Sequence, residues 1–252
     1  MPTAAAFAAD DRVADRNERI IDAYVASHPD DYEGLDALVF ELTGQHIDVT
    51  INGVDGELSA SEAQTIVDAR NEARPAVVDG DVSIQSIPSD AFTVSMVRTP
   101  ISTWNAQFRG SWNFRDDYVN GDGRPDFASL GFRIPSCVSI GSHTSATYLW
   151  NNTATSSSNL RSSNVGADAP IWNVFDNISG FQRSNDHGNV TVRLTNRCGT
   201  VQYGNQAAFN YEANIGGANV LSLSAGIGFI SASYSGGAQA YERGTSAITF
   251  AI

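Results

Sequence analysis

The stretch from Trp104 to Phe114 constrains the fold of this chain more than any other feature. Apolar or small residues alternate with polar ones over eleven positions without a break. One face holds Trp104, Ala106, Phe108, Gly110, Trp112 and Phe114, and the other holds Asn105, Gln107, Arg109, Ser111 and Asn113. Successive side chains of a β-strand point to opposite sides. The period therefore predicts one long antiparallel strand that is half-buried, with its polar face in solvent.

The chain after residue 79 has the same character throughout, because helical periodicity is absent and Ser, Thr, Asn and Gly separate short alternating runs. Further strands are predicted near 83–98, 130–134, 138–150, 190–194, 200–213, 219–234 and 238–252. Many short alternating strands indicate a β-sandwich or a barrel. The segment 152–170 is long and polar, and we expect a surface loop of the kind that often carries function.

Residues 10–78 follow a different pattern. Apolar residues at helical spacing predict a first helix over 10–28, capped by Asp10 or Asp11. They predict a second helix over 31–43, which ends near Gly44. A short strand is expected at 46–53, and a third helix to Glu72 that begins with a capping box of Ser59 and Glu62. The predicted fold class is α+β overall: a small acidic helical N-terminal domain (10–78), followed by a mainly antiparallel all-β sandwich or barrel domain (79–252).

The charge of the chain is concentrated in its N-terminal part. Residues 1–80 hold 17 Asp and Glu against 5 Arg, whereas residues 81–252 hold 11 against 10, and the chain has no Lys. Binding to nucleic acid needs clustered positive charge, so a nucleic-acid partner is not expected. Two interpretations of the acidic segment stay open: a solvated helical surface, or an electrostatic mask over an Arg-bearing β surface.

The N-terminus and the two cysteines indicate an exported protein. The triplet Ala6-Phe7-Ala8 has the small-x-small form of a signal-peptidase site, so we expect residues 1–9 to be a disordered signal remnant; an Ala-rich disordered end is the alternative. Cys137 and Cys198 are far apart and belong to no CxxC motif. In a secreted, extracellular protein they predict one disulfide, whereas in the cytosol they would be free thiols.

The best local motif is the stretch 116–126, Asp-Asp-Tyr-Val-Asn-Gly-Asp-Gly-Arg-Pro-Asp. Calcium prefers six to eight oxygen ligands, and alternating Asp and Asn on a tight turn can supply them. The motif resembles the D-x-N-x-D-G-x-x-D loops of calcium-binding repeats in exported proteins, except that Tyr118 replaces the first Asp. The predicted ligands of a structural calcium ion are Asp117, Asn120, Asp122 and Asp126. A plain Asn-Gly or Asp-Gly hairpin turn is the alternative.

No catalytic motif is present, and the catalytic residues stay unknown. The chain lacks HExxH and Gly-x-Ser-x-Gly. His143 or His187 could belong to a Ser-His-Asp triad. Glu212 and Glu242 could form the carboxylate pair of a glycosidase. Neither pattern is specific, so whether the protein is an enzyme stays open, with the non-enzymatic interpretation preferred.

The segment 219–234 contains no charge and alternates apolar with small residues. We expect it to be the central strand of the sandwich, packed on both faces; a strand that contacts a membrane is the alternative. The leading hypothesis is a secreted non-enzymatic binding or surface protein, with a cell-surface glycan or protein as partner. Two alternatives are a secreted hydrolase precursor with an inhibitory N-terminal segment, and a pore-forming or membrane-active toxin.

Overall fold

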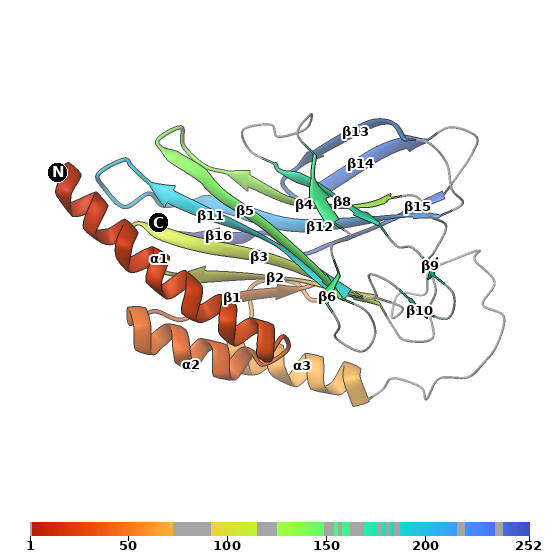
Figure 1. Cartoon of the computed structure of the whole chain (residues 1–252), viewed down its shortest axis with the longest axis horizontal. Coiled ribbons are helices and arrows are strands. Elements are labelled where there is room, and N and C mark those ends of the chain that lie inside the picture. The colour runs from red at the N-terminus through yellow and green to blue at the C-terminus, as the bar shows by residue number, and fades with distance from the viewer. Residues whose placement is uncertain are drawn as a thin grey trace.

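The computed structural model describes residues 2–72, 92–114, 125–148, 154–155, 158–161, 169–175, 178–179, 182–183, 187–215, 220–234 and 239–252. These residues form three helices and a set of antiparallel sheets arranged in layers (Figure 1). The helices are α1 (Ala4–Ser27), α2 (Tyr32–Thr43) and α3 (Ala60–Glu72). The strands are β1 (Asp48–Ile51), β2 (Phe92–Pro100), β3 (Asn105–Phe114), β4 (Pro125–Arg133), β5 (Val138–Tyr148), β6 (Ala154–Thr155), β7 (Ser158–Leu160), β8 (Ile171–Phe175), β9 (Ile178–Ser179), β10 (Gln182–Arg183), β11 (His187–Asn196), β12 (Asn205–Ile215), β13 (Val220–Gly226), β14 (Phe229–Tyr234), β15 (Gln239–Gly244) and β16 (Ile248–Phe250).

Two six-stranded sheets form the body of the molecule. Sheet A has the strand order β1-β2-β3-β11-β5-β6. Sheet B has the order β15-β12-β4-β8-β7, and β16 pairs with β12 beside β15. The strands β9–β10 and β13–β14 form two further two-stranded sheets. The predicted mainly antiparallel β architecture is confirmed, and the stacking of sheets A and B is sandwich-like.

The main core lies between the two sheets. Phe108 of sheet A packs against Phe132 and Phe250 of sheet B, with ring centroids 5.3 and 4.7 Å apart. Trp112 and Tyr211 make a similar contact at 5.2 Å. The predicted apolar face of β3 therefore points into the core, because interleaved side chains from two inner faces are what hold a sandwich together. Other buried members include Val94, Met96, Leu130, Trp172, Val190, Val192, Leu194 and Phe209.

The helices cover the outer face of sheet A and form a second core there. Its buried members include Ile21, Val25, Leu35, Val39, Val49, Ile51, Ala63, Val67, Val97 and Ile101. The helical segment also adds β1 to the edge of sheet A, where β1 pairs with β2. Part of the polar face of β3 is buried too: Gln107 is 1% exposed and Arg109 is 5% exposed, while Ser111 and Asn113 are half-buried. The expectation that this face meets solvent was wrong, because α1 lies over it.

Helix α1 begins earlier than expected. Thr3 caps it, with the Ala6 N–H donating to Thr3 Oγ1, so residues 4–9 form helical turns. Asp10 does not cap the helix; its carboxylate instead accepts hydrogen bonds from Ser102 Oγ and from the Trp104 N–H. This contact fastens α1 to the turn between β2 and β3.

The buried side of α1 is only partly the apolar stripe that the sequence indicated. Ala14, Asn17, Ile21 and Val25 are its buried residues, while Val13 is 48% exposed. Asn17 donates from Nδ2 to the backbone carbonyl of Ile101 at 2.9 Å. A polar residue is tolerated at this buried position because its amide has a hydrogen-bond partner.

The ends of the two shorter helices agree with the prediction. Gly44 follows α2 in the left-handed conformation. The Ser59 N–H donates to Glu62 Oε2 and the Glu62 N–H donates to Ser59 Oγ, which is the expected capping box. Among the described residues, no helix combines the length and the hydropathy needed to cross a membrane.

Candidate functional site

The hairpin β13–β14 is the element that departs most from the sandwich. It covers most of the segment expected to be one central strand, and that expectation was wrong. The chain instead reverses at Ile227 and Gly228, and Gly226 pairs with Phe229 across the turn. The two strands pair with each other and form a sheet separate from sheets A and B (Figure 1). Gly228 has φ of 72°, a conformation that residues with a side chain rarely adopt.

The sequence carries a signal for this turn that the alternation alone hides. Serine occupies even positions before the turn, at Ser222 and Ser224, and odd positions after it, at Ser231 and Ser233. A continuous strand would keep one parity on one face. The change of parity, together with the two glycines around Ile227, marks a two-residue hairpin loop.

The two faces of the hairpin differ sharply in chemistry. Ser222, Ser224, Ser231 and Ser233 are exposed, and the hydroxyls of Ser222 and Ser233 lie 2.6 Å apart. The opposite face is apolar and points to sheet B. It holds Val220, Leu223, Ala225, Ile230 and Ala232, of which Ile230 is 1% exposed. The hairpin is therefore amphipathic with period two, except that Phe229 beside the turn shares the serine face and is 47% exposed, and no charge interrupts either face.

The apolar face packs on a small cluster that is separate from the main core. Ile230 contacts Phe127 of β4 and Ile171 of β8, both of which are buried. At the tip the two backbones touch: a Cβ placed on Gly131 of β4 would lie 2.2 Å from the carbonyl oxygen of Gly226. Only a residue without a side chain allows this approach.

The rest of the surface under the hairpin, which we call its seat, is formed by polar residues of β12. Alternate residues of β12 point into the main core, so Asn210, Glu212 and Asn214 point toward the side on which β14 packs. All three are at most 2% exposed. The side-chain amide of Asn210 has no hydrogen-bond partner within the described part of the chain. A buried amide without a partner costs free energy, so this seat holds the hairpin less firmly than an apolar one would.

Within the part of the chain that the structure describes, a hydrogen bond joins the hairpin to the edge of sheet B. The Ile230 N–H donates to Glu242 Oε1 at 2.9 Å. Glu242 is exposed and lies opposite Glu212 in the register of β15 with β12. The two glutamates also delimit the hairpin in the sequence, because residues 213–241 contain no charged residue. The uncharged amphipathic hairpin is thus flanked in the sequence by two glutamates that belong to strands of sheet B.

The glutamates do not favour the glycosidase interpretation. They are cross-strand neighbours, a geometry compatible with paired carboxylates. However, Glu212 is 2% exposed, which leaves a substrate no access to it in this form. The histidines lie elsewhere: His143 is near the ring of Trp172, and His187 stacks on Tyr148. Burial lowers the pKa of His143.

The predicted calcium ligands are only partly within the described residues. Asp117, Asn120 and Asp122 lie outside them. Asp126 is buried in β4, and its two carboxylate oxygens accept from the Tyr211 hydroxyl and from the Asn214 N–H, each at 2.7 Å. Within the described ranges, no group of three metal-binding side chains comes together. The calcium site therefore stays a prediction.

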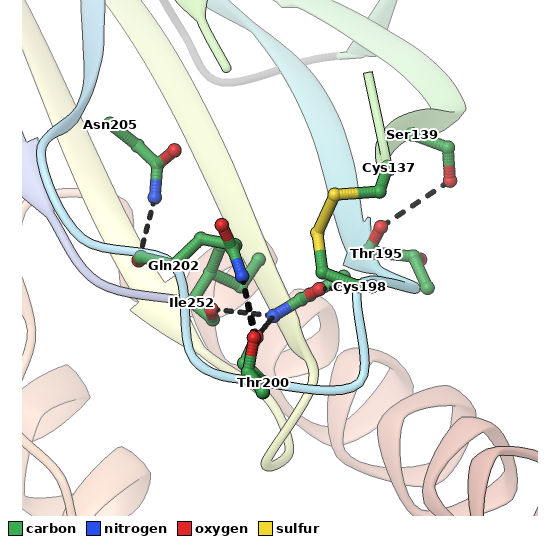
Figure 2. Close-up of a disulfide and its surroundings, with 9 residues drawn as sticks. Cys137, Ser139, Thr195, Cys198, Thr200, Gln202, Asn205 and Ile252 are labelled. Carbon is green, nitrogen blue, oxygen red and sulfur yellow. Dashed lines mark hydrogen bonds between the residues drawn. A yellow bond between two sulfur atoms is a disulfide. The ribbon is translucent and has the colours of Figure 1, made fainter. Parts of the chain in front are cut away.

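The predicted disulfide is present in the structure. Cys137, just before β5, is bonded to Cys198, just after β11 (Figure 2). The bond joins neighbouring strands of sheet A, and hydrogen bonds order the chain around it. Asn196 accepts from the Cys198 N–H and donates to the carbonyl oxygens of Thr200 and Ile252. The bridge therefore ties the start of β5 to the end of β11, and the Asn196 amide ties the end of β11 to the C-terminal residue Ile252.

Comparisons with known proteins add little to this description. No protein-family model and no curated protein matches the chain. Among solved structures, one matching chain is described as a pore forming protein; the match has 9% sequence identity, covers 61% of this chain and 84% of the other, and has a TM-score of 0.31. A likeness of this strength establishes neither the fold nor the function of the present chain.

Proposed function

We propose that this protein is an exported, non-enzymatic, membrane-active protein whose hairpin β13–β14 leaves sheet B and enters a lipid bilayer. The observation that carries the proposal is the hairpin itself: it is uncharged, amphipathic with period two, and outside both large sheets. The proposal takes up the alternative of a pore-forming or membrane-active protein in preference to the leading hypothesis of a secreted binding or surface protein, because of the hairpin that the structure describes.

The length of the uncharged segment suits a membrane-spanning hairpin. A transmembrane β-strand needs about 9–11 residues. The uncharged run comprises fourteen residues before the turn, at 213–226, and thirteen after it, at 229–241, so each side is long enough for such a strand. Charged side chains on a lipid-facing strand are costly. The lack of charge between Glu212 and Glu242 therefore matches the requirement along the whole span.

The alternation assigns a role to each face. The face with Leu223, Ala225, Ile230 and Ala232 would meet lipid, and the serine face would meet water. A single hairpin cannot satisfy its edge hydrogen bonds in lipid. Hairpins from several copies must therefore join into a closed barrel, with serines lining the lumen. This arrangement makes the active form an oligomer.

The serine face provides a sharp test, because Ser224 is exposed in the soluble form and its substitution need not disturb folding. We expect Ser224→Glu to make the channel more cation-selective and Ser224→Arg to make it more anion-selective, measured as reversal potentials across planar bilayers. On the lipid face, Ala232→Glu should abolish dye release from liposomes. Circular dichroism would establish that each variant is folded.

A matched control lies at a serine outside the hairpin. Ser61 of α3 is exposed, so Ser61→Glu adds the same charge away from the proposed lumen and should leave selectivity unchanged. Absence of leakage from vesicles of any composition, with folded protein, would remove the membrane proposal. Leakage with the same reversal potential for both Ser224 variants would show that this face does not line the pore.

A further inference from the structure

One side of α1 carries a row of carboxylates. Asp11, Asp15, Glu18 and Asp22 are spaced by four, three and four residues, which places them along one face of the helix. The row lies beside the buried residues of α1 and above the outer face of sheet A, as the position of α1 in Figure 1 indicates. Each of the four contacts an arginine of the β part.

Two arginines near the end of β11 form ion pairs with three of these carboxylates. Arg193 Nη1 lies 2.5 Å from Asp15 Oδ1 and 3.3 Å from Glu18 Oε2. Arg197 Nη2 donates to Asp11 Oδ2 at 2.8 Å. The Arg193 side chain is 12% exposed and that of Arg197 is 43% exposed. The helix thus covers guanidinium groups that the β part alone would present to solvent.

A third arginine lies under the middle of the helix. Arg109 Nη2 is 3.1 Å from Asp22 Oδ1, which also accepts from Gln107 Nε2 at 2.9 Å. Arg109 belongs to β3 and Arg193 to the neighbouring β11, where Arg193 pairs with Gln107. Arg109 and Arg193 are therefore two positions apart on adjacent strands and share one face of the sheet. We call Arg109, Arg193 and Arg197 the arginine face.

The cover over this face has an electrostatic cost. Burial raises the pKa of Glu18, and its neighbours Asp22 and Asp15 raise it too, while Arg193 opposes them. Burial likewise lowers the pKa of Arg109, with Asp22 opposing. Both shifts mean that the charged forms have lost hydration that the pairing only partly restores. A ligand with many anionic groups in water can therefore compete with α1.

We propose that the arginine face is a docking surface for the anionic headgroups of a membrane, and that α1 covers it in the soluble form by imitating their charge. The inference rests on the proposed membrane activity for the choice of ligand. Guanidinium groups bind phosphate oxygens in the same two-pronged way as carboxylates. Arginines on adjacent strands of one sheet face, with a third just after β11, can each contact a different headgroup of a membrane surface.

The test uses the full chain and co-sedimentation with vesicles of phosphatidylcholine alone or mixed with phosphatidylserine. The variant Asp15→Asn/Glu18→Gln removes both carboxylates closest to Arg193. We expect it to bind anionic vesicles about fivefold more tightly than the wild type, which is the gain typical of one arginine at an anionic surface. Binding to phosphatidylcholine alone should not change.

Two controls separate this mechanism from a general change of charge. Glu33→Gln/Glu41→Gln removes the same charge from exposed positions of α2 and should not increase binding by more than a small factor. In the background with the weakened cover, Arg193→Gln/Arg197→Gln should reduce binding to anionic vesicles to the level of neutral ones. Arg133→Gln, at an exposed arginine of β4, should leave it unchanged.

The proposal is overturned if the α2 control binds as tightly as the α1 variant, if the loss of Arg193 and Arg197 has no effect, or if only a soluble polyanion such as heparin binds. Dye release separates it from the proposed function. Arginine-dependent binding without leakage would leave the docking surface in place and remove the pore. Leakage that does not change when the arginines are replaced would support the pore and remove the docking surface.

Discussion

Gly131 is the position at which the docked hairpin can be disturbed with the smallest chemical change. A Cβ at this residue would lie 2.2 Å from the Gly226 carbonyl oxygen and 2.8 Å from the Ile227 nitrogen. Both atoms belong to the hairpin backbone, so no side-chain rotation relieves the contact. In Gly131→Ala the hairpin must move away from β4 as a unit.

The magnitude follows from the contacts that hold the hairpin. Overpacking of this kind costs about 1–3 kcal/mol. The main apolar anchor, Ile230, contributes about 1.5–3 kcal/mol by its burial. The penalty is as large as the contribution of this anchor, so we expect the docked form to lose much of its advantage over the released form. The population of the released form should rise by about 5- to 150-fold for a penalty of 1–3 kcal/mol.

The appropriate assay is amide hydrogen exchange followed by mass spectrometry on peptides that cover 220–234. A melting temperature is a poor readout, because replacing Gly by Ala also stabilises by about 0.4–1 kcal/mol through the unfolded chain. Exchange in 220–234 should become faster while β11 stays protected, and dye release from liposomes should become faster in parallel. Gly141→Ala is the control, since its Cβ would meet only the Arg193 carbonyl oxygen at 3.3 Å. Unchanged exchange in Gly131→Ala would refute the reasoning.

Three further predictions concern other parts of the molecule. Replacing Cys137 and Cys198 by Ala should lower the free energy of unfolding by about 4 kcal/mol in urea titrations, and full alkylation of the native protein without reductant would contradict the bond. If calcium binds, chelator should lower the melting temperature of the wild type and leave Asp122→Ala unaffected; no response in the wild type counts against the site. The hydrogen bond from the Tyr24 hydroxyl, and then that from the Gly34 N–H, hold the pKa of Asp31 below its usual 3.8. Because the pKa of Asp31 is lower in the folded state, the stability that it contributes is present above pH 3.8 and is lost as the pH falls through the folded value. The free energy of unfolding of Asp31→Asn should therefore depend less steeply on pH than that of the wild type in this acidic range. Identical pH dependences would contradict this.

Local patterns in the sequence determined the elements that depend on neighbours along the chain. The capping box of Ser59 and Glu62 is formed by residues three positions apart, so the sequence is sufficient to specify it. The apolar face of β3 follows in the same way from the period of the strand. The hairpin turn at Gly228 could also have been found, because the parity of serine changes there.

The tertiary structure decided what covers each face, and this depends on partners distant in the chain. The polar face of β3 was expected in solvent because alternation reports polarity and not burial. Asp22 of α1 reaches Arg109 across 87 positions, which no local pattern encodes. In the same way, the seat of the hairpin exists only because Gly131 and Gly226, far apart in sequence, allow two backbones to touch. Sequence periodicity fixes the direction of side chains, whereas long-range packing fixes which of them meet water.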